Sequence, residues 1–465
     1  MQIPDHALLD RMRYQADTQA DATVSRIIGT WKEVPSKASV EESQAINAAQ
    51  WRRLSYVNRL FGKWQNNGSL AGWKSTDPGT PAEIAAELES YVHAAQALPA
   101  WASPEKILLA EKVFIDNGFL SCVLLFCSSL PECYIAPDLS SVLHVSGQLE
   151  SNTDYRIRAT AAMIFPVMMT GGLTSPEGSG IAQILKVRLI HATIRNLILH
   201  GNPEEIAQAF CVDPQCRVSK VRPSHPDSCA SRNVPQNLFA RGWDLRNNAL
   251  PCNQEELAYT LLTFGYVFLR SLRRLGLGLS QAEEEAYLHA WNVMGHILGI
   301  QRELMADTME QAASLFAQIQ ARSRSRQVEP DPRPALAQAL MQTMQSVIPT
   351  GILRPFPVLL TIHLCGRANA KELGLHRRTF LLSRLLFASL ALITRGIDWL
   401  IHLVFPRFSI ARLSTRLLGE HFMSQVLLSQ VRPLKLPQPL LNQVQTMMDV
   451  WGSKPKPKSK STDKR

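Results

Sequence analysis

The chain has 465 residues, of which 46% are hydrophobic and 19% are charged. This apolar fraction excludes a globally disordered chain, and the length suits two or three average domains or one large helical domain. Lys and Arg number 49 against 39 Asp and Glu, which gives a net charge of +10. A positive balance of this size is compatible with a phospholipid surface or with nucleic acid and indicates neither.

The first residues, MQIPDHALLDRMRYQAD, contain no apolar core of a signal peptide. We therefore expect a cytoplasmic protein whose eight cysteines are reduced thiols. No stretch reaches the roughly 18 uncharged apolar residues of a spanning helix. The nearest, residues 379–405, is interrupted by Arg384, Arg395 and Asp398. It predicts an amphipathic helix that packs on the core or, alternatively, makes peripheral contact with a membrane.

The apolar periodicity along the chain predicts helices and no strand of convincing length. In chain order we expect a polar helical arm over residues 1–35 and then helices over 43–62, 82–97, 104–129 (broken near Gly118), 134–170, 182–200, 253–276, 281–299, 303–321, 335–347, 357–372, 379–404 and 412–429. The predicted fold class is all-α, a single large multi-helix domain. Its expected divisions are residues 1–100, 101–375, 376–452 and a basic tail at 453–465.

Two helix starts carry local signals. Asn253 precedes Glu256 by three residues, and Ser280 precedes Glu283 by three, which is the spacing of an N-cap with a capping box. Residues 201–251 have no period, so we expect a long irregular loop there. The thiols of Cys211, Cys216, Cys229 and Cys252 could hold zinc in this loop, but their spacing matches no tight knuckle and favours ordinary reduced cysteines.

The helix predicted over residues 182–200 is the most informative element. It is apolar nearly all round, as buried helices are, yet Arg188, His191 and Arg195 recur at i, i+3 and i+7 and share one face. A guanidinium group cannot lose its proton, so two buried arginines require anions nearby. Heme would satisfy this face, with iron for the imidazole and propionates for the arginines. Alternatively, acidic residues of other helices pair with the arginines and His191 packs in the core.

A second polar cluster lies upstream of this helix. Arg156 and Thr160 are i and i+4 and so share a helix face, which is followed by the apolar run AAMIFPVMM. If that face opposes His191, both side chains would lie where a bound ligand such as O₂ is polarised. The other interpretation is the start of a helix that faces solvent.

The order of motifs resembles the catalytic domain of latex-clearing proteins (rubber oxygenases) and of the ER-bound oxygenases related to them. The matching pieces between residues 110 and 375 are SLPECY (129–134), SGQLE (146–150), the 156–160 segment, GGLTSPEGSG (171–180), KVRLIHATIR (186–195), LPCNQEELAYTLLTFGYVFLRSLRRLGL (250–277), YLHAWNVMGHILGI (287–300) and CGRANAKELGL (365–375).

The resemblance implies an all-α protein that binds one b-type heme non-covalently and uses O₂ to cleave carbon–carbon double bonds in isoprenoid-like substrates. It further implies that His191 is the proximal iron ligand and that Arg188 and Arg195 lie beside the heme. Arg156 and Thr160 match the family's distal arginine and threonine, which orient O₂.

Two positions depart from the family pattern. Rubber oxygenases can place an iron-ligating lysine immediately before the distal threonine, where this chain has Ala159. They also use a glutamate as general base upstream of the distal arginine, and no residue aligns with it; Glu132 and Glu150 are the available carboxylates. Both departures, and the missing secretion signal, favour a smaller hydrophobic substrate over extracellular polyisoprene.

The sequence therefore predicts a heme-dependent oxygenase acting with O₂ on a hydrophobic unsaturated or lipid-like molecule. The alternatives are a helical heme- or lipid-binding protein without turnover and a peripheral membrane scaffold without a cofactor. His289 and His296, seven residues apart, could line a cofactor pocket but are more typical of helix packing. We expect no nucleic-acid partner, because the sequence has no aromatic and basic stacking platform.

Overall fold

The computed structural model describes residues 4–33, 45–137, 153–212, 243–326, 331–346 and 350–375, with single positions and runs of two or three residues between and after these ranges. The N-terminal helices are α1 (His6–Met12), α2 (Thr18–Ile28), α4 (Ala48–Phe61), η1 (Gly68–Leu70, 3₁₀), α5 (Ala82–Ala95) and α6 (Pro104–Asp116). They are followed by α7 (Gly118–Leu124), η2 (Leu125–Ser129, a π-helix), α8 (Leu130–Tyr134), α11 (Thr153–Met168), α12 (Gly180–Leu199) and α13 (Pro203–Val212). The remainder are α15 (Leu245–Asn248), α16 (Gln254–Phe264), α17 (Tyr266–Leu275), α18 (Gln281–Ile297), η5 (Arg302–Leu304), α19 (Met309–Arg324), α20 (Arg333–Ser346), α21 (Phe356–Cys365) and α22 (Arg367–Glu372).

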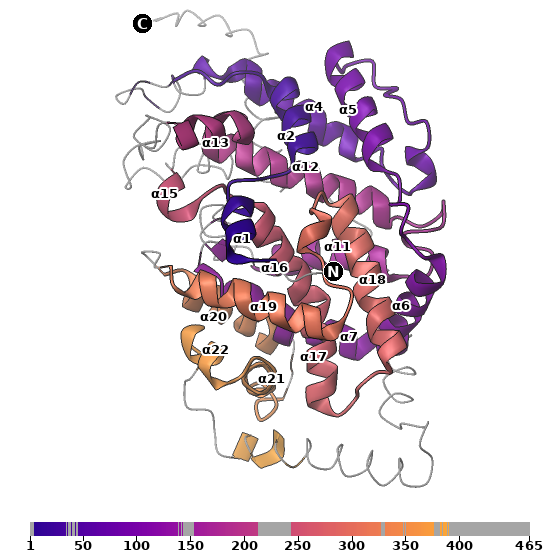
Figure 1. Cartoon of the computed structure of the whole chain (residues 1–465), viewed down its shortest axis with the longest axis vertical. Helices are drawn as coiled ribbons and strands as arrows, with labels where there is room; N and C mark the ends of the chain where they lie inside the picture. Colours follow the sequence, from indigo (N-terminus) through magenta and orange to yellow (C-terminus); the bar gives the residue numbers. More distant parts are fainter. Residues whose placement is uncertain are drawn as a thin grey trace, which may run out of the picture.

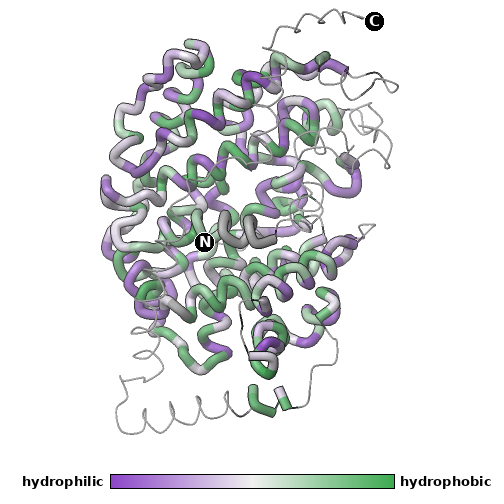
Figure 2. Tube along the Cα trace, turned by 180° about the vertical axis from the view of Figure 1, so that it is seen from behind, coloured by the Kyte–Doolittle hydropathy of each residue, from purple (hydrophilic) through white to green (hydrophobic). Residues whose placement is uncertain are grey.

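The predicted all-α class is confirmed, and no strand occurs among the residues that the structure describes. Hydrophobic and hydrophilic positions alternate along most helices (Figure 2), as expected for helices that each bury one face. One continuous hydrophobic core runs from Leu9 in α1 to Leu375 after α22. The helices on both sides of the expected division at residue 100 therefore share a single core.

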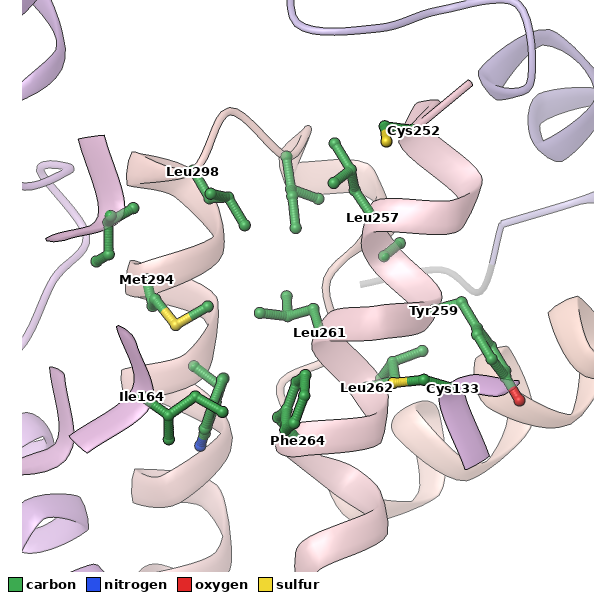
Figure 3. Packing of buried hydrophobic residues seen from close by; sticks show 14 of the residues in the cluster. Cys133, Ile164, Cys252, Leu257, Tyr259, Leu261, Leu262, Phe264, Met294 and Leu298 are labelled. Atoms are coloured by element: carbon green, nitrogen blue, oxygen red, sulfur yellow. The ribbon is translucent and has the colours of Figure 1, made fainter. Parts of the chain in front are cut away.

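The helix starts follow the capping signals. The Asn253 side chain accepts a hydrogen bond from the backbone N–H of Glu256 at the start of α16, and Ser280 and Glu283 form the expected capping box of α18. These two helices pack on each other: Leu257, Leu261 and Phe264 of α16 point toward Met294 and Leu298 (Figure 3). A helix that begins at its capping residue places every later residue on a defined face, so the caps set which side chains enter the core.

Five expected elements are wrong in detail. The helix expected over 357–372 breaks at Gly366 into α21 and α22, and the helix expected over 303–321 starts at Met309 as α19. The segment expected as a polar arm contains α2, whose residues Val24, Ile27 and Ile28 are buried against the rest of the molecule. The helix expected over 253–276 breaks at Gly265 into α16 and α17, and the loop expected to begin at Gly201 starts with helix α13. The predicted break near Gly118 is confirmed, with a bend of 90° between α6 and the helix that follows.

Helix α12 lies in the middle of the molecule, between α2 on one side and α11 and α18 on the other (Figure 1). Among the described residues no single helix has both the length and the apolar composition needed to cross a bilayer. The predicted amphipathic segment at 379–405 lies largely outside the described residues. The predicted helix at 412–429 and the basic tail at 453–465 lie wholly outside them.

Candidate functional site

Helix α12 is buried along most of its surface. The positions that keep partial solvent exposure are one set, with steps of three or four residues: Gln183, Val187, Ile190, His191 and Ile194. Such steps place the set on one face of the helix, which we call the α12 stripe. The stripe is apolar except for Gln183 at its first turn and His191 at one edge. His191 is thus the only imidazole on a half-buried, mainly apolar face of this helix.

The two arginines of α12 make ion pairs with carboxylates of α2. Arg188 donates to Asp17, with 2.8 Å from Nη2 to Oδ1, and also donates to the backbone oxygen of Ile297 at 3.0 Å. Arg195 Nε lies 2.8 Å from Asp21 Oδ1, and Nη1 donates to the backbone oxygen of Cys252 at 3.0 Å. The anions that the sequence required are therefore present within the chain itself, as the alternative with acidic residues from another helix expected.

Burial makes these ion pairs structurally important. The side chains of Arg195 and Asp21 are only 1% and 3% exposed. Burial raises the pKa of Asp21 to about 6, against the opposing effect of the Arg195 charge. Removing one partner of a buried ion pair leaves an unpaired charge in the core, which costs about 3–5 kcal/mol. The Arg195–Asp21 and Arg188–Asp17 pairs therefore fix α12 against α2 and hold His191, which lies between the two arginines in sequence.

Helix α11 packs closely on α12 and carries the two predicted distal residues. The turn at 171–180 connects α11 to α12, and the two helices are in contact. The backbone is tightly packed in this turn, since an added Cβ on Gly172 would lie 2.2 Å from the backbone oxygen of Pro166. Arg156 lies twelve residues before the end of α11 and His191 eleven residues after the start of α12. At about 1.5 Å per residue they are roughly level along the two helices. The side chain of Thr160 is half-buried, and that of Arg156 lies outside the described part of the chain.

Lys186 is the third cation of α12, and the sequence analysis did not single it out. Its side chain is 1% exposed, and within the described part of the chain it makes no hydrogen bond or ion pair. Burial lowers the pKa of Lys186 to about 8. Lys186 is three residues from Gln183 and four from Ile190, so it borders the α12 stripe at the edge opposite His191.

The two carboxylates considered as a general base are placed differently. Glu132, at 0% exposure, forms an ion pair with Arg270 and accepts hydrogen bonds from Asn369 at 2.9 Å and Gln320 at 3.0 Å. These contacts join α8 to α17, α19 and α22, which is the arrangement of a structural ion-pair network. Glu150 lies outside the described residues.

Glu111 is a buried carboxylate that sequence reasoning missed. It accepts a hydrogen bond from the backbone N–H of Gly171 at 3.0 Å, and its other oxygen, Oε1, is buried without a hydrogen-bond partner among the described residues. Burial raises the pKa of Glu111. The residue therefore anchors the turn between α11 and α12 to α6. Only its position within an apolar helix, where a carboxylate is unusual, could have drawn attention to it.

The other candidate ligands are also accounted for. His289 and His296 both pack edge-on against Trp101, and the His289 Nε2 accepts a hydrogen bond from the backbone N–H of Ser103. The packing interpretation of these histidines therefore holds. Cys252 is buried, whereas Cys216 and Cys229 and the side chain of Cys211 lie outside the described residues. Among the described residues no group of three or more His, Cys, Asp or Glu side chains could hold a metal ion.

The α12 stripe fits a heme better than it fits a bare metal ion. A heme needs only one protein side chain on its iron, and the stripe has an imidazole, that of His191, at its edge. The apolar positions Val187, Ile190 and Ile194 suit a porphyrin face. For the propionates the chain offers Lys186 and the Nη2 of Arg195, which is buried without a hydrogen-bond partner in the described structure.

Comparison with known proteins is consistent with this architecture. Residues 232–395 match the sequence model of the family described as "ER-bound oxygenase mpaB/B'/Rubber oxygenase, catalytic domain". A rubber oxygenase of Streptomyces sp. (strain K30) is 22% identical over 264 residues, which are 54% of this chain and 53% of that protein. The chain thus aligns with about half the length of this relative.

A solved structure of the latex clearing protein in its closed state has a similar fold. The TM-score is 0.53 at 20% sequence identity, and the match covers 80% of this chain and 86% of that one. At this identity the likeness concerns the fold alone. The residues matched by the family model begin after α12, so they do not include Arg156, Thr160, Arg188, His191 or Arg195.

Proposed function

We propose, from the similarity of this chain to the rubber oxygenase catalytic domain, that it is a heme-dependent oxygenase that uses O₂ on a hydrophobic unsaturated substrate. The observation that carries the proposal is His191. It lies on the only half-buried face of a helix that is otherwise enclosed by protein, and this face is almost wholly apolar. The local chemistry of this face supports it as the site.

In this proposal His191 holds the iron through a neutral ring nitrogen. Heme bound there would supply the iron centre at which O₂ is activated. Arg188 and Arg195 act mainly through their ion pairs with α2, because those pairs fix the rotation of α12 and so the direction of His191. The Nη2 of Arg195 adds one hydrogen-bond donor toward a propionate oxygen.

We place Arg156 and Thr160 of α11 on the opposite side of the site from His191. The backbone of Arg156 on α11 is roughly level with that of His191 on α12. The guanidinium of Arg156 and the hydroxyl group of Thr160 would stabilise negative charge that develops on oxygen in the reaction. Ala159 has no group that could bind iron, so the family's lysine ligand has no counterpart here. The alternative of a heme-binding protein without turnover rests on this departure and on the structural role of Glu132.

The first test is spectroscopic. Purified protein reconstituted with hemin should show a Soret band, and His191→Ala should lose it. His296→Ala is the matched control, because this histidine is exposed on α18 and its ring packs edge-on against Trp101. A wild-type protein that stays colourless after reconstitution would exclude both the heme-dependent oxygenase and the heme-binding protein without turnover. The remaining hypothesis would be the peripheral membrane scaffold without a cofactor. A Soret band that survives in His191→Ala would exclude His191 as the ligand.

The second test separates an oxygenase from a binding protein. O₂ consumption is measured with a panel of isoprenoids and unsaturated lipids, and wild-type protein should consume O₂ with at least one of them. Arg156→Ala should keep the Soret band and lose turnover by about 10²–10³-fold, the usual cost of removing one charge-stabilising donor. Unchanged turnover would contradict the role given to Arg156. Heme binding without O₂ consumption on any substrate would favour the non-catalytic binder.

A further inference from the structure

Lys186 is energetically anomalous among the cations of α12. Arg188 and Arg195 each have a carboxylate of α2 within hydrogen-bond distance. Lys186 is as deeply buried and yet has neither a carboxylate nor a hydrogen-bond acceptor among the described residues. Burying an ammonium group without a partner is strongly unfavourable. A residue with this cost is more consistent with a ligand contact than with a role in packing, which Met or Leu would serve better.

The position of Lys186 relative to the stripe identifies the kind of ligand. With about 100° per residue, Lys186 and His191 lie roughly 140° apart around α12, and Ile190, Gln183, Ile194 and Val187 occupy the arc between them. A molecule along this arc would meet an imidazole at one edge, apolar side chains in the middle and an ammonium group at the other edge. That sequence of contacts matches a flat or extended apolar molecule with a carboxylate at one end.

We propose that Lys186 binds the carboxylate of the apolar molecule that occupies the α12 stripe. The carboxylate has two chemical sources, a propionate of the heme or the carboxyl group of an unsaturated fatty acid. The inference rests on the proposed function for the location of the site and adds the residue that recognises the anionic end of its occupant. It also reassigns the principal anion contact, because the arginines that the sequence suggested already have carboxylate partners within the chain.

Two variants and a control test the proposal without an activity assay. Lys186→Met keeps the length of the side chain and removes its charge, while Lys186→Arg keeps the charge. Lys112→Met removes an exposed lysine of α6 and serves as the control. Without any ligand, Lys186→Met should melt a few degrees higher than wild type, since it removes an unpartnered buried charge. Lys112→Met should melt at the wild-type temperature.

Binding then identifies the source of the carboxylate. Protein is titrated with hemin and with hemin dimethyl ester by absorbance, and with linoleic acid and methyl linoleate by calorimetry. Wild type and Lys186→Arg should bind an acid at least tenfold more tightly than its ester, and Lys186→Met should lose most of this preference, keeping only the part that Arg195 Nη2 supplies. A preference seen only with hemin assigns the propionate. A preference seen only with linoleate assigns the substrate.

The outcomes that overturn the inference are distinct from those that overturn the function. Equal binding of acid and ester by wild type in both titrations, or a preference of undiminished size in Lys186→Met, would exclude Lys186 as the anion contact. A lower melting temperature in Lys186→Met would show that the lysine has a stabilising partner within the protein. Failure of both hemins to bind would contradict the proposed oxygenase alone, and the linoleate titration would then decide the role of Lys186.

Discussion

Asp21 makes it possible for Arg195 to be buried. The guanidinium keeps its charge at any accessible pH, and the carboxylate on α2 is its one ionic partner among the described residues. We expect Asp21→Asn to lower the free energy of unfolding by about 3–5 kcal/mol, the cost of an unpaired buried charge. Urea unfolding followed by circular dichroism at pH 7.5 measures the change.

An exposed ion pair between α2 and α5 supplies the control for Asp21. Arg26 of α2 lies 2.7 Å from Glu87, but its side chain is 55% exposed. Glu87→Gln should therefore change the free energy of unfolding by about 1 kcal/mol or less. Equal losses in the two variants would mean that burial does not distinguish the pairs and that α2 does not fix α12 through its carboxylates.

Lys186 gives a second expectation at this scale, in the pH dependence of stability. Its pKa is lowered to about 8 by burial, below the value near 10.4 in an unfolded chain. Because the unfolded state binds the proton more tightly, wild-type stability should rise as the pH increases from about 8 to 10.4. The advantage of Lys186→Met should be about 3 kcal/mol below pH 8 and should vanish near pH 10.5. A difference independent of pH would show that packing, not charge, separates the two proteins.

At the scale of elements, the turn at 171–180 sets how α11 meets α12. Gly172 and Gly178 have no room for a side chain, since an added Cβ would lie 2.2 Å and 2.1 Å from backbone oxygens. Glu111 holds the same turn through the N–H of Gly171. The level of Arg156 relative to His191 therefore depends on a turn whose backbone is tightly packed.

Gly172→Ala tests this dependence. The added methyl group must displace backbone atoms, so we expect a clear loss of thermal stability and a shifted or weakened Soret band in the reconstituted protein. Gly351→Ala is the control, because nothing lies within 4 Å of its Cβ position. A stable Gly172→Ala protein with an unaltered heme spectrum would show that the turn does not set the geometry of the site.

For the molecule as a whole, periodicity and capping residues predicted the helices that carry their own signals. The starts of α16 and α18 follow from Asn253 and Ser280, and the break near Gly118 follows from a glycine in an apolar run. The role of α2 could not be predicted in this way. Its Asp17 and Asp21 have the pattern of a solvated helix start, and their burial depends on arginines that lie 171 and 174 residues further along the chain.

The candidate site likewise has features that local sequence predicts and features that depend on the packing of distant segments. Charge and burial alone predicted that Arg188 and Arg195 must meet anions, and this expectation is confirmed. Which anions they meet depends on packing between distant segments, and that information is absent from local sequence. Lys186 could not be singled out from the sequence, because only the structure shows that its side chain is buried without a carboxylate partner among the described residues. The similarity to rubber oxygenases supports the proposed chemistry, and the role of His191 is a prediction that the spectroscopic test decides.

The separation of Asp17 from Arg188 also has a temporal consequence. On a ribosome that adds about 5–20 residues per second, α2 emerges on the order of ten seconds or more before the arginines it will hold. During that interval its carboxylates are hydrated, and its apolar residues have no finished core to enter. The N-terminal helix α2 can pack against α12 only after α12 has been synthesised. The order of synthesis thus requires part of the N-terminal half to complete its packing late, on the helix that we propose binds the cofactor.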